Sequence, residues 1–289
     1  PTICRGDSAK IGATAVTGNT YAWTSKPAGF TSTLSNPKVA PDSTTMYYLT
    51  ETSTITRCKK TDSVMVNVNQ LPKAQTGIGK TICNTDSVTI GAAAVTGNTY
   101  IWLSKPPGFY SPKSLVRVAP SVSTKFILTE TITATGCKRT DSVTINVNPI
   151  PQAIVGSTKT ICWGDTVVIG STSVKGNTYS WSSKPIGFSS TLSNPKVVPV
   201  EKIKYYVTET ITATGCTKSD SVLVNVNPLP PAKAGVSQVI CNGVTVGIGS
   251  SFVTGRKYSW TSNPKGFTAT IANPTVTPNT STTYYLTET

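Results

Sequence analysis

The sequence predicts an all-β protein that is built as a tandem array of small β-sandwich domains. Two observations lead to this prediction. The sequence repeats itself every 79 residues without insertion or deletion, which is the pattern of a repeat architecture. Short runs rich in Val, Thr, Tyr and Ile also alternate with turns rich in Gly, Asn, Asp and Pro, as they do in β-sandwiches.

The repeat is visible in four series of residues, each with a step of 79 residues. Two series are cysteines, one is tryptophan and one is proline: Cys4, Cys83, Cys162 and Cys241; Cys58, Cys137 and Cys216; Trp23, Trp102, Trp181 and Trp260; Pro41, Pro120, Pro199 and Pro278. These series predict four domains, which we name repeats 1 to 4: residues 1–69, 70–148, 149–227 and 228–289. Repeat 1 lacks its beginning and repeat 4 its end, so we expect the array to continue in both directions.

Repeat 3 shows the expected elements in order. They are STKTIC (157–162), the turn WGD (163–165), TVVIGSTSV (166–174), the turn KGN (175–177), TYSWSS (178–183), the loop SKPIGF (183–188), SSTLSNPKVVPV (189–200), KYYVTETIT (204–212), the turn ATGC (213–216) and TKSDSVLVNVN (217–227). About seven short strands in such a unit suit an immunoglobulin-like sandwich.

Alternation within the strands indicates which side chains form the core. Val222, Val224 and Val226 are spaced by two residues, so they lie on one face of their strand. Tyr179 and Trp181 share a face for the same reason. A tryptophan in a central strand fills the core of such a sandwich, and we therefore expect the four periodic tryptophans to be core residues.

Short proline-rich links join the repeats. Asn-Pro-Ile-Pro at 148–151 and Asn-Pro-Leu-Pro at 227–230 restrict the backbone to extended conformations. We therefore expect the domains to follow one another end to end as a rod.

The seven cysteines predict disulfides rather than a zinc site, because the chain has no His and no Cys-x-x-Cys motif. Two cysteines in each full repeat indicate an oxidising compartment outside the cytoplasm. We expect an extracellular protein at the cell surface.

Two disulfide pairings fit the spacing. Pairing within repeats joins Cys4 to Cys58, Cys83 to Cys137 and Cys162 to Cys216, which leaves Cys241 without a partner. Pairing between repeats joins Cys4 to Cys137 and Cys83 to Cys216. The first cysteine of a repeat follows its first strand and the second lies at the last hairpin, so the two belong to opposite ends of a sandwich. Bridged Cα atoms must lie within about 7 Å. We favour pairing between repeats, and the within-repeat pairing stays open at this point.

The sequence offers no constellation for catalysis. It has no His, the commonest general base. Ten of its twelve acidic residues belong to three repeat positions: Glu51, Glu130, Glu209 and Glu288; Asp62, Asp141 and Asp220; Asp7, Asp86 and Asp165. An active site needs an asymmetric cluster in one unit, whereas acids copied once per repeat are explained as turn and cross-strand partners. We expect no enzyme, no metal and no cofactor.

The net charge of +14 raises the question of nucleic-acid binding. The Lys and Arg residues are spread over every repeat without a long basic run, so we expect no nucleic-acid partner and consider acidic polysaccharide or an anionic surface instead. No apolar run is long enough for a transmembrane helix.

Two of three further features have ordinary structural explanations. Arg5-Gly6-Asp7 forms an RGD tripeptide, yet it occupies the turn after the first cysteine, where Gly and Asp are favoured anyway. The loop SKPxGF recurs at 25–30, 104–109 and 183–188, and its Phe is expected to cap the core; sugar stacking is the alternative. Trp163 is the one tryptophan outside the periodic series.

The repeat motif resembles a known family. It reads I-C-x-G-D, Y-x-W, N-P-x-V-x-P, Y-Y-x-T-E-T and G-C-x-x-(T/S)-D-S-V-x-V-N-V-N-P-x-P, and it is similar to the immunoglobulin-like or PKD-like repeats of giant surface proteins of Bacteroidota. The resemblance covers the whole chain. It implies export by the type IX secretion system and a link to gliding motility. Repeat 4 departs from the pattern at Val244 and at Arg256-Lys257, and repeat 2 departs at Leu115-Val116.

These observations predict a non-catalytic structural stalk of a cell-surface filament or giant adhesin. The partners of each repeat would be the neighbouring repeats of the same chain, and surface polysaccharide or substratum. The alternative is a carbohydrate-binding repeat array of a secreted polysaccharide-active protein. Exposed aromatic side chains on one face of each repeat would favour the alternative.

Overall fold

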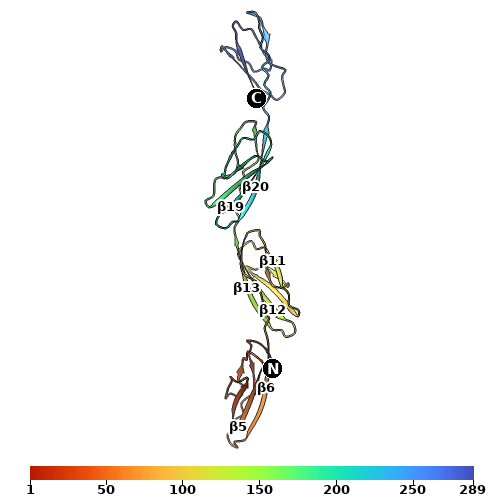
Figure 1. Ribbon diagram of the computed structural model, residues 1–289, viewed down its shortest axis with the longest axis vertical. Coiled ribbons are helices and arrows are strands. Elements are labelled where there is room, and N and C mark those ends of the chain that lie inside the picture. Colours follow the sequence, from red (N-terminus) through yellow and green to blue (C-terminus); the bar gives the residue numbers. More distant parts are fainter. The chain divides into compact units, whose positions relative to one another are not determined.

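The computed structural model describes residues 1–289 and contains strands and turns but no helix, so no helix is present that could cross a membrane. The chain divides into two compact units, Pro1–Ile150 and Pro151–Thr289. Unit 1 contains repeats 1 and 2, and unit 2 contains repeats 3 and 4. The colours of Figure 1 follow the chain from unit 1 to unit 2.

Repeat 1 begins unit 1 with six strands. They are β1 (Thr2–Cys4), β2 (Ala9–Lys10), β3 (Asn19–Lys26), β4 (Lys38–Val39), β5 (Thr45–Ser53) and β6 (Lys59–Asn69). The larger sheet has the order β1-β6-β5-β3, and β2 pairs with β4 in the smaller one.

Repeat 2 completes unit 1 with seven strands. They are β7 (Lys80–Cys83), β8 (Val88–Gly91), β9 (Asn98–Lys105), β10 (Tyr110–Ser111), β11 (Leu115–Val118), β12 (Thr124–Ile132) and β13 (Lys138–Asn148). The larger sheet has the order β10-β9-β12-β13-β7, and β11 pairs with β8. Figure 1 shows the long strands β12 and β13 side by side.

Repeat 3 opens unit 2 with the same arrangement. Its strands are β14 (Lys159–Cys162), β15 (Val167–Val168), β16 (Asn177–Lys184), β17 (Ser189–Ser190), β18 (Lys196–Val197), β19 (Ile203–Ile211) and β20 (Thr217–Asn227). The larger sheet has the order β14-β20-β19-β16-β17, and β15 pairs with β18.

Repeat 4 has two two-stranded sheets. One pairs β21 (Val246–Gly247) with β23 (Thr275–Val276), and the other pairs β22 (Tyr258–Asn263) with β24 (Thr283–Glu288).

The topology of the full repeats is that of an immunoglobulin-like sandwich. The last two strands form an antiparallel hairpin, and the first strand lies parallel to the last one, as β7 does to β13. A parallel pair cannot be joined by a tight turn, so the rest of the sandwich lies between them in sequence. The prediction of an all-β tandem array of immunoglobulin-like domains is confirmed.

The tryptophans lie at the centre of each sandwich. Trp23, Trp102, Trp181 and Trp260 are all at most 3% exposed. The indole Nε1 of Trp23 donates to the carbonyl oxygen of Leu34, and Trp181 and Trp260 make the equivalent bond. The Nε1 of Trp102 is buried without a partner.

The phenylalanine of each SKPxGF loop packs edge-on against a core ring. Phe188 contacts Tyr205 with the ring centroids 5.2 Å apart, and Phe109 contacts Phe126 in the same way. This geometry is favourable for aromatic pairs. These phenylalanine rings are therefore part of the core and are not free to stack on a sugar.

Candidate functional site

The most strongly buried charged side chains of the full repeats are glutamates of the TET strands. Glu130 on β12 is 4% exposed and Glu209 on β19 is 3% exposed. Each lies near the C-terminal end of its strand and points toward the inside of the sandwich. A buried carboxylate is costly unless it accepts hydrogen bonds, so its partners decide what it does.

Each glutamate holds the link that precedes its repeat. One carboxylate oxygen of Glu209 accepts from the backbone N–H of Ala153 at 2.7 Å, and the other accepts from the Asn177 amide at 2.7 Å. In repeat 2, Glu130 accepts from the N–H of Ala74 and from Asn98, both at 2.7 Å. The glutamate therefore ties the link to the sheet.

The same position is used differently in repeats 1 and 4. Glu51 accepts from the Asn19 amide at 2.7 Å. In repeat 4, Arg256 occupies the position of this asparagine, and its guanidinium lies 2.6 Å from Glu288. The departure from the motif at Arg256 thus keeps a donor for the carboxylate. The expected role as a cross-strand partner holds for Glu130 and Glu209, which accept from Asn98 and Asn177 on the neighbouring strand, and the structure adds the bond to the link.

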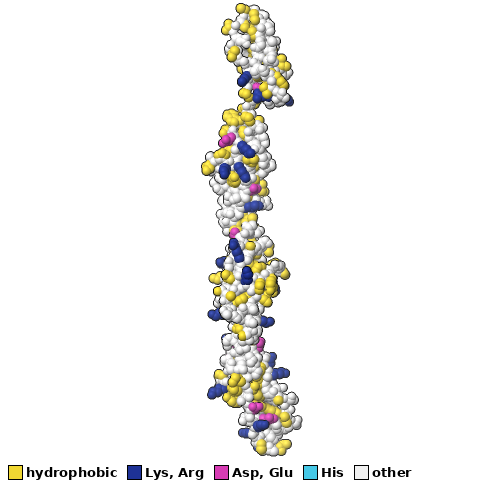
Figure 2. All heavy atoms as spheres, turned by 90° about the vertical axis from the view of Figure 1, so that its right-hand side faces the viewer, with side chains coloured by type: hydrophobic (Ala, Val, Ile, Leu, Met, Phe, Trp, Pro, Cys, Tyr) yellow, Lys and Arg dark blue, Asp and Glu magenta, His cyan; other side chains and the backbone are white.

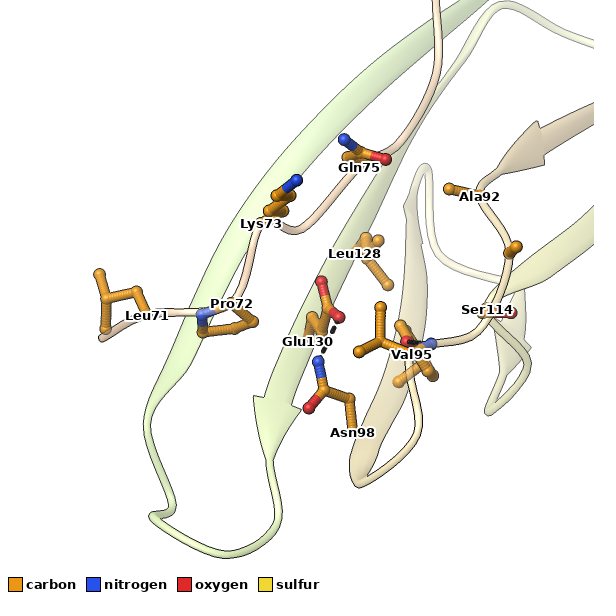
Figure 3. A pocket seen from close by; sticks show the side chains of 12 residues that line it. Leu71, Pro72, Lys73, Gln75, Ala92, Val95, Asn98, Ser114, Leu128 and Glu130 are labelled. Atoms are coloured by element: carbon orange, nitrogen blue, oxygen red, sulfur yellow. Dashed lines mark hydrogen bonds between the residues drawn. The ribbon is translucent and has the colours of Figure 1, made fainter. Parts of the chain in front are cut away.

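A cavity of about 400 Å³ lies beside Glu130. Figure 3 shows that the link residues Leu71, Pro72 and Lys73 form one side of it, and that Asn98 points toward Glu130. Both carboxylate oxygens already accept hydrogen bonds from the chain. The carboxylate of Glu130 therefore has its hydrogen-bonding partners within the chain and holds the link.

A second tie exists in repeat 2 only. The hydroxyl of Thr76 donates to Asp141 at 2.8 Å, and the N–H of Thr76 donates at 3.3 Å. Burial by itself raises the pKa of Asp141, but hydrogen bonds from Thr76 and from the N–H of Ser142, with the charge of Arg139, hold this pKa below its ordinary value. Repeat 3 has Val155 at the position of Thr76, so this tie is absent there.

A disulfide joins repeat 1 to repeat 2. Cys4 is bonded to Cys137, with Cα atoms 5.5 Å apart and 133 residues of sequence separation. The within-repeat pairing is therefore wrong for Cys4 with Cys58 and for Cys83 with Cys137. The physical reason is the one considered above, since Cys4 ends β1 beside Asn69 at the end of β6, whereas Cys58 precedes the start of β6. Cys83 and Cys216 are also disulfide-bonded.

Three disulfide candidates are free thiols. Cys58, Cys162 and Cys241 are exposed and unpaired, so the expectation of a disulfide is not met for them, and the within-repeat pair Cys162–Cys216 is wrong as well. Positions 133 residues away, which would hold partners equivalent to those of Cys4 and Cys137, fall outside residues 1–289.

The aspartates after the first cysteine shape a turn. Asp86 accepts from the N–H of Cys83 at 3.2 Å, and Asp165 accepts from the N–H of Cys162 at 3.1 Å. The RGD tripeptide lies in the equivalent turn, where the N–H of Asp7 donates to the carbonyl oxygen of Cys4 and Arg5 forms an exposed ion pair with Asp42. Trp163 lies in the corresponding turn of repeat 3 and is 51% exposed.

Neither the acids nor the basic residues gather into one site. No group of three or more His, Cys, Asp or Glu side chains is placed to hold a metal ion. Figure 2 shows Lys and Arg side chains scattered over this face of the repeats rather than collected in one patch.

Comparison with known proteins agrees with this topology. Residues 151–230 match a family model. Its description is Ig-like domain CHU_C associated, and the matched segment corresponds to repeat 3. The other repeats carry the same cysteine, tryptophan and proline series. The chain thus contains immunoglobulin-like repeats, and no enzyme family is evident. A comparison with curated proteins found no significant match.

The chain is also similar to solved arrays of immunoglobulin domains. Extracellular domains 3–5 of Drosophila OTK share 10% identity, over 78% of this chain and 94% of that chain, with a TM-score of 0.29. An I-band fragment of titin shares 11% identity, over 78% and 95%, with a TM-score of 0.35. The four N-terminal Ig domains of Dscam1 share 10% identity, over 96% and 88%, with a TM-score of 0.22. At such identities the likeness concerns the fold.

Disulfide-bonded domains of this kind belong to an oxidising, extracellular compartment. Two observations support this for the present chain, namely the bond between Cys4 and Cys137 and the bonded state of Cys83 and Cys216.

Proposed function

We propose that this chain is part of the non-catalytic structural stalk of a cell-surface filament or giant adhesin, and that it serves attachment or gliding motility. The observation that carries the proposal is the disulfide between Cys4 of repeat 1 and Cys137 of repeat 2. A domain that only binds a ligand does not need a covalent bond to the next domain. A stalk gains from it, because the bond limits the freedom of the link between domains.

The glutamate ties add to this argument. Glu130 and Glu209 fix the link that enters their repeat to the sheet of that repeat. Proline in the links restricts their backbone further. Two independent devices thus reduce motion at the links, which suits a stalk and is unnecessary for freely moving binding domains.

The role in motility rests on resemblance. The repeat motif is similar to that of giant surface proteins exported by type IX secretion, among which the gliding adhesin SprB has long arrays of nearly identical repeats. We propose the same export route and surface location for this chain.

Electron microscopy of the 289-residue chain tests the stalk. We expect thin, beaded, nearly straight particles. The variant Cys4→Ser with Cys137→Ser is the matched comparison, since it removes the bond and keeps the fold of both repeats; its particles should bend more at the link. A compact globular particle would rule the proposal out.

The alternative, a carbohydrate-binding array, is favoured by one observation: several repeats expose a tyrosine at the same position of the larger sheet. The two functions are compatible, because a stalk can also present many weak contacts.

A further inference from the structure

The larger sheet of each repeat has one face in the core and one face toward solvent, which we name the outer face. In repeat 3, Trp181 and Val207 point into the core and are each 2% exposed. The next residues along their strands, Ser182 and Tyr206, lie opposite each other and point the other way. Ser221 of β20 completes this row across three strands.

An exposed tyrosine stands in the middle of the outer face. Tyr48 is 43% exposed, Tyr206 is 36% exposed and Tyr285 is 53% exposed. They occupy one repeat position, directly after the core ring of Tyr47, Tyr205 or Tyr284. An exposed ring contributes little to a core, and because tyrosine also favours strands, the ring bears on function only together with its neighbours on the outer face.

Repeat 2 departs from this position but still exposes a tyrosine on the same face. It has Ile127 where the other repeats have tyrosine. Leu103 lies between Ile127 and Tyr110 in the register of the sheet, and Tyr110 is 65% exposed. The outer face of repeat 2 therefore also presents a ring, two strands away.

Hydroxyl groups flank the ring. Tyr48 lies between Thr24 and Ser63, and Tyr206 lies between Ser182 and Ser221. The next row of repeat 3 adds Thr208 and Ser219, whose hydroxyl oxygens are 2.8 Å apart. The outer face of repeat 3 thus combines one exposed aromatic ring with several hydroxyls, whereas that of repeat 2 also exposes Ile101 and Leu103 and that of repeat 1 exposes Met65.

The charge on the outer face is positive in repeats 2 and 3. Lys184 and Lys204 lie opposite each other beside the tyrosine row of repeat 3, and Lys105 and Lys125 do so in repeat 2. The same row holds Lys26 with Met46 in repeat 1 and Asn263 with Thr283 in repeat 4. The Lys204 ammonium lies 5.3 Å from the centroid of the Tyr206 ring.

The carboxylates of the same strands belong to the rows of the other face. Asp220 lies opposite the core residue Val207, and Asp141 lies opposite the core residue Leu128. An anionic partner would therefore meet lysines and no carboxylate on the outer face.

We propose that the outer face of the repeats, in its most complete form on repeat 3, is a binding platform for an acidic polysaccharide, with the lysine pairs contributed by repeats 2 and 3. The C–H face of a sugar ring would pack on the exposed tyrosine, serine and threonine hydroxyls would bond the sugar hydroxyls, and the lysines would pair with the acidic groups. This inference rests on the proposed role in attachment, for which it names the partner.

The geometry favours a polysaccharide over other macromolecules. A protein interface has a contiguous apolar centre with many anchors, whereas the outer face of repeat 3 presents a single exposed ring among hydroxyls and lysines. Nucleic acid requires many closely spaced cations, and here the lysines come in pairs. A polymer of repeating sugars matches a platform that recurs once per 79 residues, and several weak sites on one chain give firm attachment together.

Binding of the full chain to immobilised polygalacturonate, dextran sulfate and neutral dextran tests the proposal. We expect binding to the two acidic polymers and much weaker binding to dextran. The double variant Tyr48→Ala with Tyr206→Ala should lose at least about fivefold in affinity, because half of the four platforms lose their ring. Tyr48→Phe with Tyr206→Phe should retain most of the affinity, since it keeps both rings.

The controls separate this face from other surfaces. Trp163→Ala removes an exposed ring in a turn and should leave binding unchanged. Lys184→Ala with Lys204→Ala should lower the affinity for the acidic polymers and make that affinity less dependent on salt. Equal binding to dextran, an unchanged affinity of the tyrosine-to-alanine variant, or an equal loss in Trp163→Ala would overturn the proposal. The proposed stalk is tested separately by particle shape in the electron microscope. A failure of polysaccharide binding would therefore overturn the binding platform without deciding whether the chain is a stalk.

Discussion

At the scale of single residues, a glycine of the second strand sets how closely the tryptophan packs. Gly170 has φ of +84°, and a Cβ added there would overlap the carbonyl oxygen of Ser193 and lie 2.8 Å from the Trp181 ring. Gly12, Gly91 and Gly249 occupy the same position in the other repeats and meet the same neighbours. Only glycine fits, for reasons of both backbone conformation and space.

We predict that Gly170→Ala destabilises repeat 3 by about 3 kcal/mol or more, because it combines a strained backbone with overpacking in the core. Gly176→Ala is the matched control: its φ is +85°, but nothing lies within 4 Å of the added Cβ. It should cost only about 1 kcal/mol. Chemical denaturation followed by tryptophan fluorescence measures both, and equal losses would contradict the role of close packing.

A second residue-scale prediction concerns pH. Thr76→Val removes the hydrogen bonds of the threonine hydroxyl to Asp141 and copies Val155 of repeat 3, and should cost repeat 2 about 1 kcal/mol near neutral pH. The pKa of Asp141 is lowered from 3.8 in the folded state. The stabilisation is therefore present above this ordinary value and is lost as pH falls through the lower folded pKa.

Thermal unfolding of the two proteins between neutral pH and strongly acidic pH measures this difference. In an Asp141→Asn background, Thr76→Val should have a smaller effect that no longer changes with pH. A difference between the proteins that stays constant down to the lowest pH would show that the ionised carboxylate is not involved.

At the scale of elements, the full repeats share one device that connects a link to a strand. The backbone of Ala153 turns with φ of +53° so that its N–H points at Glu209 of β19. Ala74 and Glu130 do the same in repeat 2. Because the link is hydrogen-bonded to a strand of the sheet, its backbone has less conformational freedom than that of a flexible linker.

We predict that Glu209→Ala frees this link. It leaves the Ala153 N–H and the Asn177 amide without their acceptor, which should cost about 2 kcal/mol. Hydrogen exchange at residues 151–156 should become at least about tenfold faster. Glu201→Ala, in an exposed loop, is the control and should change neither quantity. Unchanged protection of the link in Glu209→Ala would mean that the glutamate does not hold it.

At the scale of the whole molecule, one disulfide closes a covalent loop that contains most of unit 1. The Cys4–Cys137 disulfide encloses all of repeat 1 after its first strand and most of repeat 2. The covalent structure of the protein is therefore a chain with closed loops. Applied to the next repeat, the same spacing pairs Cys83 with Cys216, which stays a prediction.

Peptide mapping without reduction tests the pairing. We expect linked peptides that contain Cys4 with Cys137 and Cys83 with Cys216, and unlinked peptides that contain Cys162. A linked peptide of Cys83 with Cys137 or of Cys4 with Cys58 would contradict the proposed order of bonds.

Stretching single molecules from their ends measures the consequence. A Cys83→Ser background isolates the Cys4–Cys137 bond, because it removes the second disulfide. While the Cys4–Cys137 bond is intact in this background, residues 4–137 cannot extend, since tension passes through the sulfur atoms. Adding Cys4→Ser should release about 480 Å of chain once the repeats unfold, from 133 residues at about 3.6 Å each. Cys58→Ser removes a free thiol and is the control that should release nothing. Equal extension of the oxidised chain and Cys4→Ser would show that the bond carries no tension.

The sequence by itself determined the repeat, the sandwich and the core tryptophans. The burial of residues such as Trp181 and Val222 can be predicted from local periodicity, because alternation along a strand and spacing along the chain do not depend on distant parts of the protein. The position of the turn at Cys162 and the hairpin at Cys216 followed from the same local patterns. The end-to-end arrangement of the repeats stays a prediction from their links.

Only the tertiary structure decided which residues far apart in the sequence contact one another. The sequence predicts Glu209 as a turn or cross-strand partner, and its burial against Ala153 depends on how the link folds back over the sheet. The bond of Cys4 to Cys137 spans 133 residues, and the sequence favoured this pairing but left the within-repeat pairing open. The outer-face row of Ser182, Tyr206 and Ser221 exists because three strands pair in one register. Such contacts are set by packing over long sequence distances, and no local pattern contains them.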